Sequence, residues 1–288
     1  MSQADEIKHS SYTKAGRRSE IWYDGIGANS VLEIEAISTR PIVEREFLLI
    51  DVKATRKGGH SAKNNVVFIS DLHWDGWNRE LYESLSKEIS SLQPDYILFG
   101  GDLGVYSDTI DGAVNWLATL SARKGKYAVA GNRESCLNWL EVDFWRSAYA
   151  SAGFEFLSNE VVDVGDLCLC GIDDYRFGKP DWSVLNGVDR KHTVITFTHN
   201  PDAAASRDLE TYLGDIVLCG HTHGGQLCFP VIGPLYTSSE FGRQFLHGWK
   251  TRDDGTLCLV SNGIGESGFG IMRQRIRCPR EFVLLRME

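Results

Sequence analysis

The sequence predicts an α/β fold built from two mostly buried sheets with helices outside them. Short apolar runs of four to six residues, rich in Val, Ile, Leu and Phe, recur along the chain and are bounded by polar or glycine residues, as buried strands are. Longer stretches between the early runs carry apolar residues at a spacing of three or four, which is the pattern of helices that cover a sheet. Several runs end directly at carboxylate, carboxamide or imidazole side chains, so the predicted strands carry chemical groups at their ends.

The first part of the chain is predicted to lead into one or two strands. Residues 1–25 are polar and charged and are expected to form a mobile or peripheral segment. From Ser30 to Val52 apolar and charged residues alternate, which is typical of half-buried strands, and residues 57–65 form a polar connector. No linker, repeat or low-complexity tract divides the 288 residues, and an apolar content of 42% is enough for a sizeable core. We therefore expect one domain over residues 1–288.

A regular succession of strands and helices follows. The predicted strands are 66–70, 96–99 and 127–130, and the helices after them are 81–92, 110–120 and 137–152. Asp71 to Asp102 spans 31 residues and Asp102 to Asn132 spans 30, close to the length of one strand, crossover helix and return strand. Each unit therefore delivers one candidate functional side chain. From residue 155 onward the strand candidates lie closer together, at 161–164, 167–170, 193–197, 216–219, 227–229, 257–260 and 282–285.

Charge and composition narrow the function classes. The net charge is −9 and the pI is about 5.4, which argues against generic nucleic-acid binding because that mode relies on many Lys and Arg residues. An acidic protein that handles phosphate needs local positive charge, which bound divalent cations would supply. No apolar stretch approaches the ~18 residues needed to span a bilayer. We expect a cytoplasmic protein, with peripheral contact to a membrane surface left open and the oligomeric state not predicted.

The seven cysteines include no Cys-x-x-Cys pair of the zinc-binding type, and their number is odd. Four of them lie inside apolar runs: Cys168, Cys170, Cys219 and Cys258. Buried free thiols in a reducing compartment are therefore the expected state.

Five short segments carry the candidate chemistry. They are Asp71-Leu72-His73, Gly101-Asp102, Gly131-Asn132, Thr198-His199 and the string from Gly220 to Gly225 that contains His221 and His223. Because the loops beyond the carboxyl ends of strands in an α/β sheet form the ligand crevice, side chains far apart in sequence can converge there. Aspartate, asparagine and histidine suit divalent ions, and a carboxylate shared by two ions is typical of sites that activate water. The recurrence points to a two-metal hydrolytic centre.

Each segment taken alone also has a structural explanation. Asp71 could cap a helix or turn, and His73 could be an ordinary loop residue. Asp102 follows two glycines and could shape a turn, while His221 and His223 could be polar turn residues. The metal interpretation depends on the whole set in this order.

As a set, these residues resemble the calcineurin-like metallophosphoesterases over about residues 66–225. Four strings are further similar to the YkuE-like branch, which includes UDP-2,3-diacylglucosamine hydrolases of lipid A synthesis: Gly171-Ile172-Asp173-Asp174, Thr198 to Asp202, Gly220 to Gln226 and Asn262 to Gly265. The resemblance implies a four-layer αββα sandwich of two mixed sheets flanked by helices. We expect a phosphoester hydrolase that uses a metal-activated hydroxide and forms no covalent enzyme intermediate.

The resemblance also assigns the metal ligands. It implies that Asp71, His73 and His223 hold one ion, that Asn132, His199 and His221 hold the other, and that Asp102 bridges them. Manganese is the expected ion, with iron and zinc as alternatives that suit the same ligands. The residues themselves indicate the ligand chemistry and the strand-end positions, whereas the division between the two ions comes only from the resemblance.

One residue departs from the family pattern. The family usually has a histidine after Gly-Asn, where this chain has Arg133. A guanidinium stays protonated, so Arg133 can stabilise developing negative charge but cannot give a proton to a leaving group. We therefore expect Asp102, Asn132 and Arg133 to be the catalytic residues, and pyrophosphate linkages or activated esters to react better than alkyl phosphomonoesters.

The expected substrate is a phosphorylated small molecule or nucleotide-lipid with a phosphodiester or pyrophosphate bond. Its most specific form is of the UDP-2,3-diacylglucosamine type. A generic or cyclic-nucleotide phosphodiesterase is the nearest alternative. Another alternative is a non-catalytic binding scaffold, which the presence of all seven candidate ligands disfavours.

Other residues near these segments leave two interpretations open. Four tryptophans could form a wall for an acyl chain or nucleobase, or could pack in the core: Trp74, Trp77, Trp139 and Trp145. Four arginines could clamp a second phosphate or form a solvated face: Arg273, Arg275, Arg277 and Arg280. Asp173 and Asp174 are expected to organise a loop, with support of a histidine as the alternative.

Overall fold

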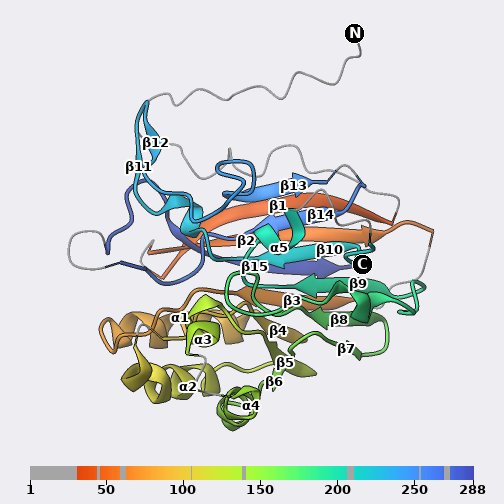
Figure 1. Ribbon diagram of the computed structural model, residues 1–288, viewed down its shortest axis with the longest axis horizontal. Coiled ribbons are helices and arrows are strands. Elements are labelled where there is room, and N and C mark those ends of the chain that lie inside the picture. The colour runs from red at the N-terminus through yellow and green to blue at the C-terminus, as the bar shows by residue number, and fades with distance from the viewer. Residues whose placement is uncertain are drawn as a thin grey trace.

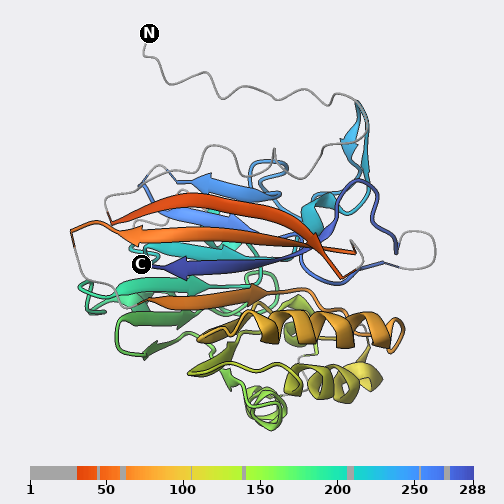
Figure 2. The ribbon, with the colours of Figure 1, turned by 180° about the vertical axis from the view of Figure 1, so that it is seen from behind.

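The computed structural model describes residues 31–43, 46–58, 63–104, 106–137, 141–205, 211–252, 254–268 and 273–288. Two mixed sheets pack face to face at its centre, and helices cover the outer face of one of them (Figure 1, Figure 2). The expected α/β sandwich is confirmed. The N-terminal segment expected over residues 1–25 lies outside the described residues.

The first sheet has seven strands. In spatial order they are β1 (Leu32–Ile42), β2 (Phe47–Arg56), β15 (Arg280–Met287), β3 (Asn64–Ile69), β4 (Tyr96–Phe99), β5 (Gly125–Ala128) and β6 (Glu155–Phe156). Strands β3 to β6 are parallel neighbours, as the succession of strands and helices predicted. The antiparallel hairpin β1–β2 forms the opposite edge of the sheet from β6. Strand β15 lies between β2 and β3, parallel to β2 and antiparallel to β3.

The second sheet has six strands. In spatial order they are β13 (Gly248–Thr251), β14 (Leu257–Val260), β10 (Ile216–Cys219), β9 (Thr193–Phe197), β8 (Leu167–Gly171) and β7 (Glu160–Asp163). Its four central strands are parallel, and both edge strands are antiparallel to their neighbours. Two further strands, β11 (Cys228–Phe229) and β12 (Gly233–Pro234), form a short antiparallel ribbon that protrudes from the sandwich (Figure 1).

Alternating side chains divide the apolar residues among three cores. In β3, Val67 and Ile69 face the helices, whereas Val66 and Phe68 face the second sheet. The same alternation in β10 sends Leu218 toward the first sheet. Because both faces of these strands are buried, their sequences are continuous apolar runs, which is why they could be recognised.

Three helices cover the outer face of the seven-stranded sheet: α1 (Arg79–Ser91), α2 (Ile110–Ala118) and α4 (Val142–Ser151). α1 buries Tyr82, Leu85 and Ile89, whose spacing of three and four residues places them on one side of the helix. A short helix, α3 (Asn132–Cys136), and a 3-10 turn, η1 (Ser107–Thr109), lie in the same layer. None of the helices in the described part of the chain has the length and apolar character needed to cross a membrane.

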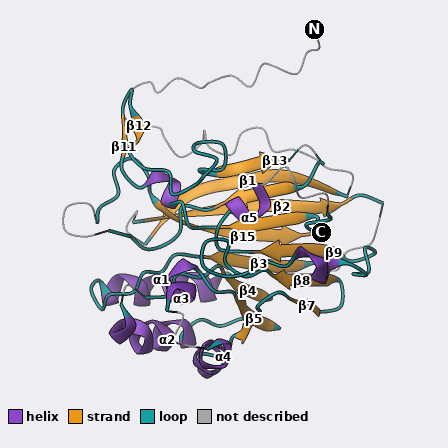
Figure 3. Cartoon of the chain, viewed as in Figure 1, coloured by secondary structure: helices purple, strands orange, loops and turns teal. Residues whose placement is uncertain are grey.

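The outer face of the six-stranded sheet is covered differently. Its apolar cover comes from α5 (Asp202–Ala205), the 3-10 helix η2 (Trp182–Leu185) and loops, and no longer helix lies there in the described ranges (Figure 3). Gly178, Pro180 and Gly187 interrupt the connection from β8 to β9, and both residue types disfavour a continuous helix. The fourth layer of the sandwich is therefore formed mainly by loops.

Candidate metal centre

Five loops converge where the carboxyl ends of the two sheets meet. Strands β3, β4 and β5 of the first sheet lead into Asp71 with His73, into Asp102 and into Asn132, while β9 and β10 of the second lead into His199 and into His221 with His223. Six of these seven side chains are buried, and Asn132 is half-buried. The structure thus brings every sequence-predicted metal ligand to one place.

Asp71, His73 and His223 form a first set. The Nε2 atoms of His73 and His223 are 3.0 Å apart. Asp71 Oδ1 lies 3.5 Å from the Nε2 of His223 and 3.9 Å from that of His73. One ligand atom from each residue lies within 4.8 Å of the others, a spacing that one metal ion could bridge.

Asn132, His199 and His221 form a second set. The Nε2 of His199 lies 3.1 Å from Asn132 Oδ1 and 3.1 Å from His221 Nδ1. The remote nitrogens of both rings face backbone carbonyls, because His199 Nδ1 lies 2.8 Å from Gly100 O and His221 Nε2 lies 2.9 Å from Ser238 O. A neutral ring that donates to its carbonyl presents the lone pair of its inner nitrogen to the set, as in histidine ligands of metal sites.

Asp102 lies between the two sets. Its Oδ2 is 3.3 Å from His73 Nε2 and its Oδ1 is 3.4 Å from His199 Nε2. The backbone N–H of Arg133 donates to the same Oδ1 at 2.8 Å, which holds the carboxylate in this orientation. One oxygen therefore faces each set, as a bridging carboxylate requires.

The backbone at these loops is strained. Asp71, His73, Asp102, His221 and His223 all have positive φ, between 45° and 69°. A non-glycine residue in this region costs about 1–2 kcal/mol and persists only where its surroundings hold it. Here the backbone N–H of Asp71 donates to Gly101 O at 2.9 Å and that of His73 donates to Asp102 O at 3.0 Å. The loops are thus shaped by mutual contact rather than by local preference.

The loops of Asp102 and Asn132 touch through glycine. A Cβ on Gly101 would collide with the backbone of Gly131, and one on Gly131 would collide with the backbone of Asp102. Gly101 also has a φ of +84°, which only glycine adopts without strain. Both glycines are therefore required for the approach of the two loops.

Glu134 supports the site and was missed in the sequence. Its buried carboxylate accepts hydrogen bonds from the backbone N–H groups of Gly131 at 3.0 Å, Asp102 at 3.1 Å and Leu103 at 2.8 Å. A fourth comes from the hydroxyl of Tyr149 at 2.9 Å. The signal that could have found it is a glutamate three residues after the glycine that precedes a helix, the spacing of a capping box.

Arg275 lies in the wall of the first set. Its Nη2 is 3.1 Å from His223 Nδ1, and the same atom donates to Asn262 O at 2.7 Å and Gly265 O at 2.5 Å. The two hydrogens on this nitrogen have closer acceptors in the two carbonyls, so the contact with His223 leaves the tautomer of the ring to be set by what the first set binds.

Two other arginines of the cluster are also engaged by protein groups. Arg273 pairs with Asp75 at 2.5 Å and donates to His73 O at 3.1 Å. Arg280 pairs with Glu46 and Glu266. In this structure these arginines are neither a solvated face nor free for a second phosphate.

Arg133 lies on α3 beside the site. Its side chain is half-buried, and the guanidinium makes no hydrogen bond to any of the described residues. Its charge is close enough to help lower the pKa of His73. The guanidinium is therefore available to a bound anion.

Burial sets the protonation of the site. It raises the pKa of Asp71 and raises the pKa of Asp102 to about 6. It lowers the pKa of His73 well below 6.5, an effect that the Arg133 guanidinium reinforces. Burial also lowers the pKa of His199, but the carboxylates of Asp102 and Asp71 raise it by more, to about 9. Carboxylates that hold protons this strongly lack sufficient positive charge around them, which divalent cations would supply.

The remaining sequence-predicted residues take structural positions. Trp74 and Trp145 pack in the core beneath the helices, Trp77 is exposed, and Trp139 lies outside the described residues. Asp174 organises its loop, as predicted, by accepting the backbone N–H groups of Arg176 and Phe177. A tryptophan wall around the site is therefore not formed by Trp74 and Trp145.

Comparison with known proteins agrees with this geometry. The model of the calcineurin-like phosphoesterase family matches residues 65–225, more than half of the chain. An Aquifex aeolicus protein described as an uncharacterized metallophosphoesterase is 32% identical over 74% of this chain and 82% of its own. The Bacillus subtilis protein YkuE, also described as an uncharacterized metallophosphoesterase, is 28% identical over 69% of this chain and 71% of its own. The Escherichia coli phosphodiesterase YaeI is 25% identical over 79% and 83%. Other relatives are longer, and the match spans 59% of the length of two of them.

Proposed function

The chain belongs to the calcineurin-like phosphoesterase family and is a metal-dependent phosphoesterase, and from this premise we propose that it hydrolyses phosphodiester or pyrophosphate bonds with two divalent ions. The observation that carries the proposal is the position of Asp102, with one carboxylate oxygen toward each set of histidines. A carboxylate shared in this way is the feature that distinguishes a two-metal site from two separate ones.

We propose that Asp71, His73 and His223 hold one ion, that Asn132, His199 and His221 hold the other, and that Asp102 bridges them. Bound ions supply Lewis-acid activation of a water and of the phosphoryl group. The chain itself orients the ligands through the carbonyls behind His199 and His221. Manganese, and less readily iron or zinc, suits this mixture of oxygen and imidazole nitrogen.

Arg133 determines which leaving groups we expect the site to accept. Its guanidinium is free to stabilise charge on the departing group but holds no proton that it can give. A phosphate leaving group needs little protonation, whereas an alkoxide needs a great deal. We therefore propose that the substrate has a pyrophosphate linkage or an activated ester, and that the catalytic residues are Asp102, Asn132 and Arg133.

The specific substrate that we propose is of the UDP-2,3-diacylglucosamine type, as the resemblance to the YkuE-like branch suggests. The Escherichia coli relative is named a phosphodiesterase, which favours a generic or cyclic-nucleotide diester as the competing substrate. We also propose that residues 1–288 act as one domain in the cytoplasm. The free state of all seven cysteines supports a reducing compartment.

Metal analysis followed by a substrate panel tests the proposal. The purified chain is stripped with a chelator, reloaded with manganese and assayed for bound metal, and we expect two equivalents per chain. It is then assayed for UMP release from a UDP-diacylglucosamine-type substrate, for ring opening of cyclic nucleotides and for cleavage of bis(p-nitrophenyl) phosphate. UMP release favours the pyrophosphate proposal and ring opening favours the alternative. Hydrolysis that persists after complete chelation would refute both.

A further inference from the structure

Two buried thiols hold the loop that carries His223. The Sγ of Cys278 donates to the backbone carbonyl of His223 at 2.8 Å. The Sγ of Cys228 donates to the carbonyl of the next residue, Gly224, at 3.3 Å. His223 has a φ of +51°, a strained conformation for a residue other than glycine, so this turn depends on partners outside itself.

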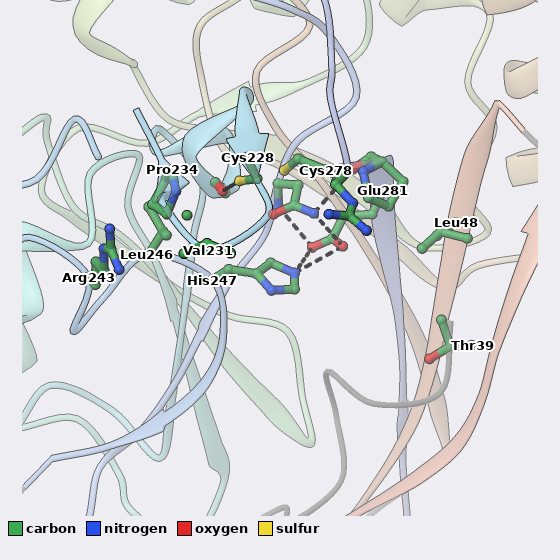
Figure 4. A pocket seen from close by; sticks show the side chains of 15 residues that line it. Thr39, Leu48, Cys228, Val231, Pro234, Arg243, Leu246, His247, Cys278 and Glu281 are labelled. Atoms are coloured by element: carbon green, nitrogen blue, oxygen red, sulfur yellow. Dashed lines mark hydrogen bonds and ion pairs between the residues drawn. The ribbon is translucent and has the colours of Figure 1, made fainter. Parts of the chain in front are cut away.

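The two cysteines are brought together by their own backbone. The N–H of Cys228 donates to Ile276 O at 2.9 Å, and the N–H of Ile276 donates to Gln226 O at 2.9 Å. This short parallel bridge pairs Leu227 with Ile276 and so brings the segments of Cys228 and Cys278 together, one residue out of register. Their thiols reach the carbonyls of two consecutive residues, and the interaction between the thiols lowers the pKa of Cys228 and raises that of Cys278. Figure 4 shows both side chains in the wall of one cavity, near Glu281 and His247.

A cavity gives small molecules access to both thiols. It has a volume of about 230 Å³, and its walls include Cys228, Cys278, Pro234 and Leu246 (Figure 4). The thiols buried in the second sheet do not line it, among them Cys219 and Cys258 on the neighbouring strands β10 and β14. An oxidant of the size of hydrogen peroxide can therefore reach this cysteine pair while the four thiols of the second sheet remain packed.

We propose that Cys228 and Cys278 form a disulfide under oxidising conditions, and that this bond weakens the metal centre by releasing the loop of His223. With hydrogen peroxide as the oxidant, two S–H bonds and the O–O bond break, one S–S bond forms, and two water molecules leave. The carbonyls of His223 and Gly224 then lose both thiol donors. The effect on metal binding rests on the proposed function, whereas formation of the disulfide does not.

Peptide mapping of the full chain tests the disulfide. The reduced, manganese-loaded protein is treated with hydrogen peroxide, its remaining thiols are alkylated, and tryptic peptides are analysed by tandem mass spectrometry that separates Cys228 from Cys219. We expect a linked peptide with Cys228 joined to Cys278, a loss of manganese of at least fivefold, and recovery of both by a thiol reductant. Alkylation of both thiols while the exposed Cys136 is oxidised would overturn the proposal. A linked peptide with unchanged manganese content would overturn the coupling to the metal centre.

Matched variants separate this pair from other oxidation. Cys228→Ser and Cys278→Ser keep a hydroxyl donor but cannot be linked, so the ratio of manganese bound before and after peroxide should approach one in each. Cys136→Ser should remain as sensitive as the natural chain, because Cys136 is exposed and its thiol donates to Arg133 O and not to the loop of His223. Sensitivity that persists in the Cys228→Ser chain would show that another group is oxidised and would refute the assignment. Because the readouts are a mass and a metal content, they stand even if no substrate of the panel is hydrolysed.

Discussion

The carboxylate of Glu134 accepts the backbone N–H of Asp102 at 3.1 Å and the backbone N–H of Gly131 at 3.0 Å. One buried side chain thus fixes the separation of the loops that carry Asp102 and Asn132. Because neither N–H reaches solvent, both lose their partner if the acceptor is removed. Glu134 is a positioning residue for the bridging carboxylate.

Replacing Glu134 by Gln should therefore loosen both loops. We expect the free energy of unfolding to fall by about 2 kcal/mol. The glutamine NH2 group would replace one carboxylate oxygen and would face two hydrogen-bond donors, which then have no acceptor. Tyr149→Phe removes only one of the four hydrogen bonds to the carboxylate and should lower stability by about 1 kcal/mol. Urea denaturation of the metal-free proteins measures both, and manganese titration should show weaker binding for E134Q than for Y149F. Equal effects of the two variants would contradict the positioning role.

Asp102→Asn tests the bridging carboxylate. The amide keeps an oxygen for the N–H of Arg133 but loses the charge shared by the two sets. We expect bound manganese to fall to one equivalent or fewer and kcat to fall at least about 10³-fold, because charge stabilisation by the ions is worth several kcal/mol. Asp111→Asn, on an exposed position of α2, is the matched control and should bind two equivalents. Turnover that survives in D102N would remove the basis for a two-metal mechanism.

Arg133→His supplies the proton donor that the natural chain lacks. We expect the natural enzyme to lose rate steeply as the pKa of the leaving group rises, because its guanidinium cannot protonate that group. R133H should be less sensitive to leaving-group pKa and should gain activity on alkyl esters relative to aryl esters. Arg133→Lys retains charge and should keep the steep dependence. A series of substituted phenyl and alkyl phosphodiesters measures the slope, and a flat slope for the natural enzyme would exclude the role assigned to Arg133.

Manganese should bind more tightly as pH rises. In the metal-free site the pKa of His199 is about 9 and that of Asp102 is about 6, so both hold a proton in acid and must release it to accept an ion. Metal binding between pH 6 and 9 should release one proton per chain, from His199. Below pH 6 it should release two, from His199 and Asp102, so the affinity for manganese falls more steeply as the pH is lowered further. Calorimetric titration in buffers of different ionisation enthalpy counts the protons. Affinity independent of pH from 5 to 8 would contradict this account.

His247 should stabilise the folded chain below neutral pH. Burial lowers its pKa, but the Glu281 carboxylate, 3.1 Å away, raises it by more, so the pKa lies above 6.5. A raised pKa contributes stability that is fully present below the unfolded value of 6.5 and is lost as pH rises through the folded value. In chelator, the free-energy difference between the natural chain and His247→Gln should be larger at pH 6 than at pH 9. A constant difference would mean that the ion pair adds nothing to stability.

The candidate site could be located in the sequence because its chemistry follows apolar runs directly. Asp71, Asp102 and His199 each come within a few residues of a strand that is buried on both faces, and such strands are continuous apolar strings. The carboxyl ends of parallel strands lie on one edge, so convergence followed from the fold class. Which atoms lie next to each other at the site did not follow from the fold class, because it depends on backbone torsions that the residue types disfavour.

Other features of the site could not be predicted for physical reasons. Glu134 lies after a ligand loop and looks like an ordinary helical glutamate until its three backbone donors are in place. Arg275 belongs to a charged stretch that resembles a solvated face, yet it is drawn inward by carbonyls of a loop ten or more residues away. Contacts between segments distant in sequence leave no local pattern. The central position of β15 in the first sheet could not be predicted for the same reason, because its partners β2 and β3 are distant in sequence.

The place of β15 also bears on how the protein is made. Residues 280–287 occupy the gap between β2 and β3, yet they are synthesised more than two hundred residues after both of those strands. Until β15 emerges, the facing edges of β2 and β3 have no partner, and unpaired edges invite association between nascent chains. A stop codon in place of Arg280 would thus remove β15 and leave the first sheet split, with β3, which leads into Asp71, at a new open edge.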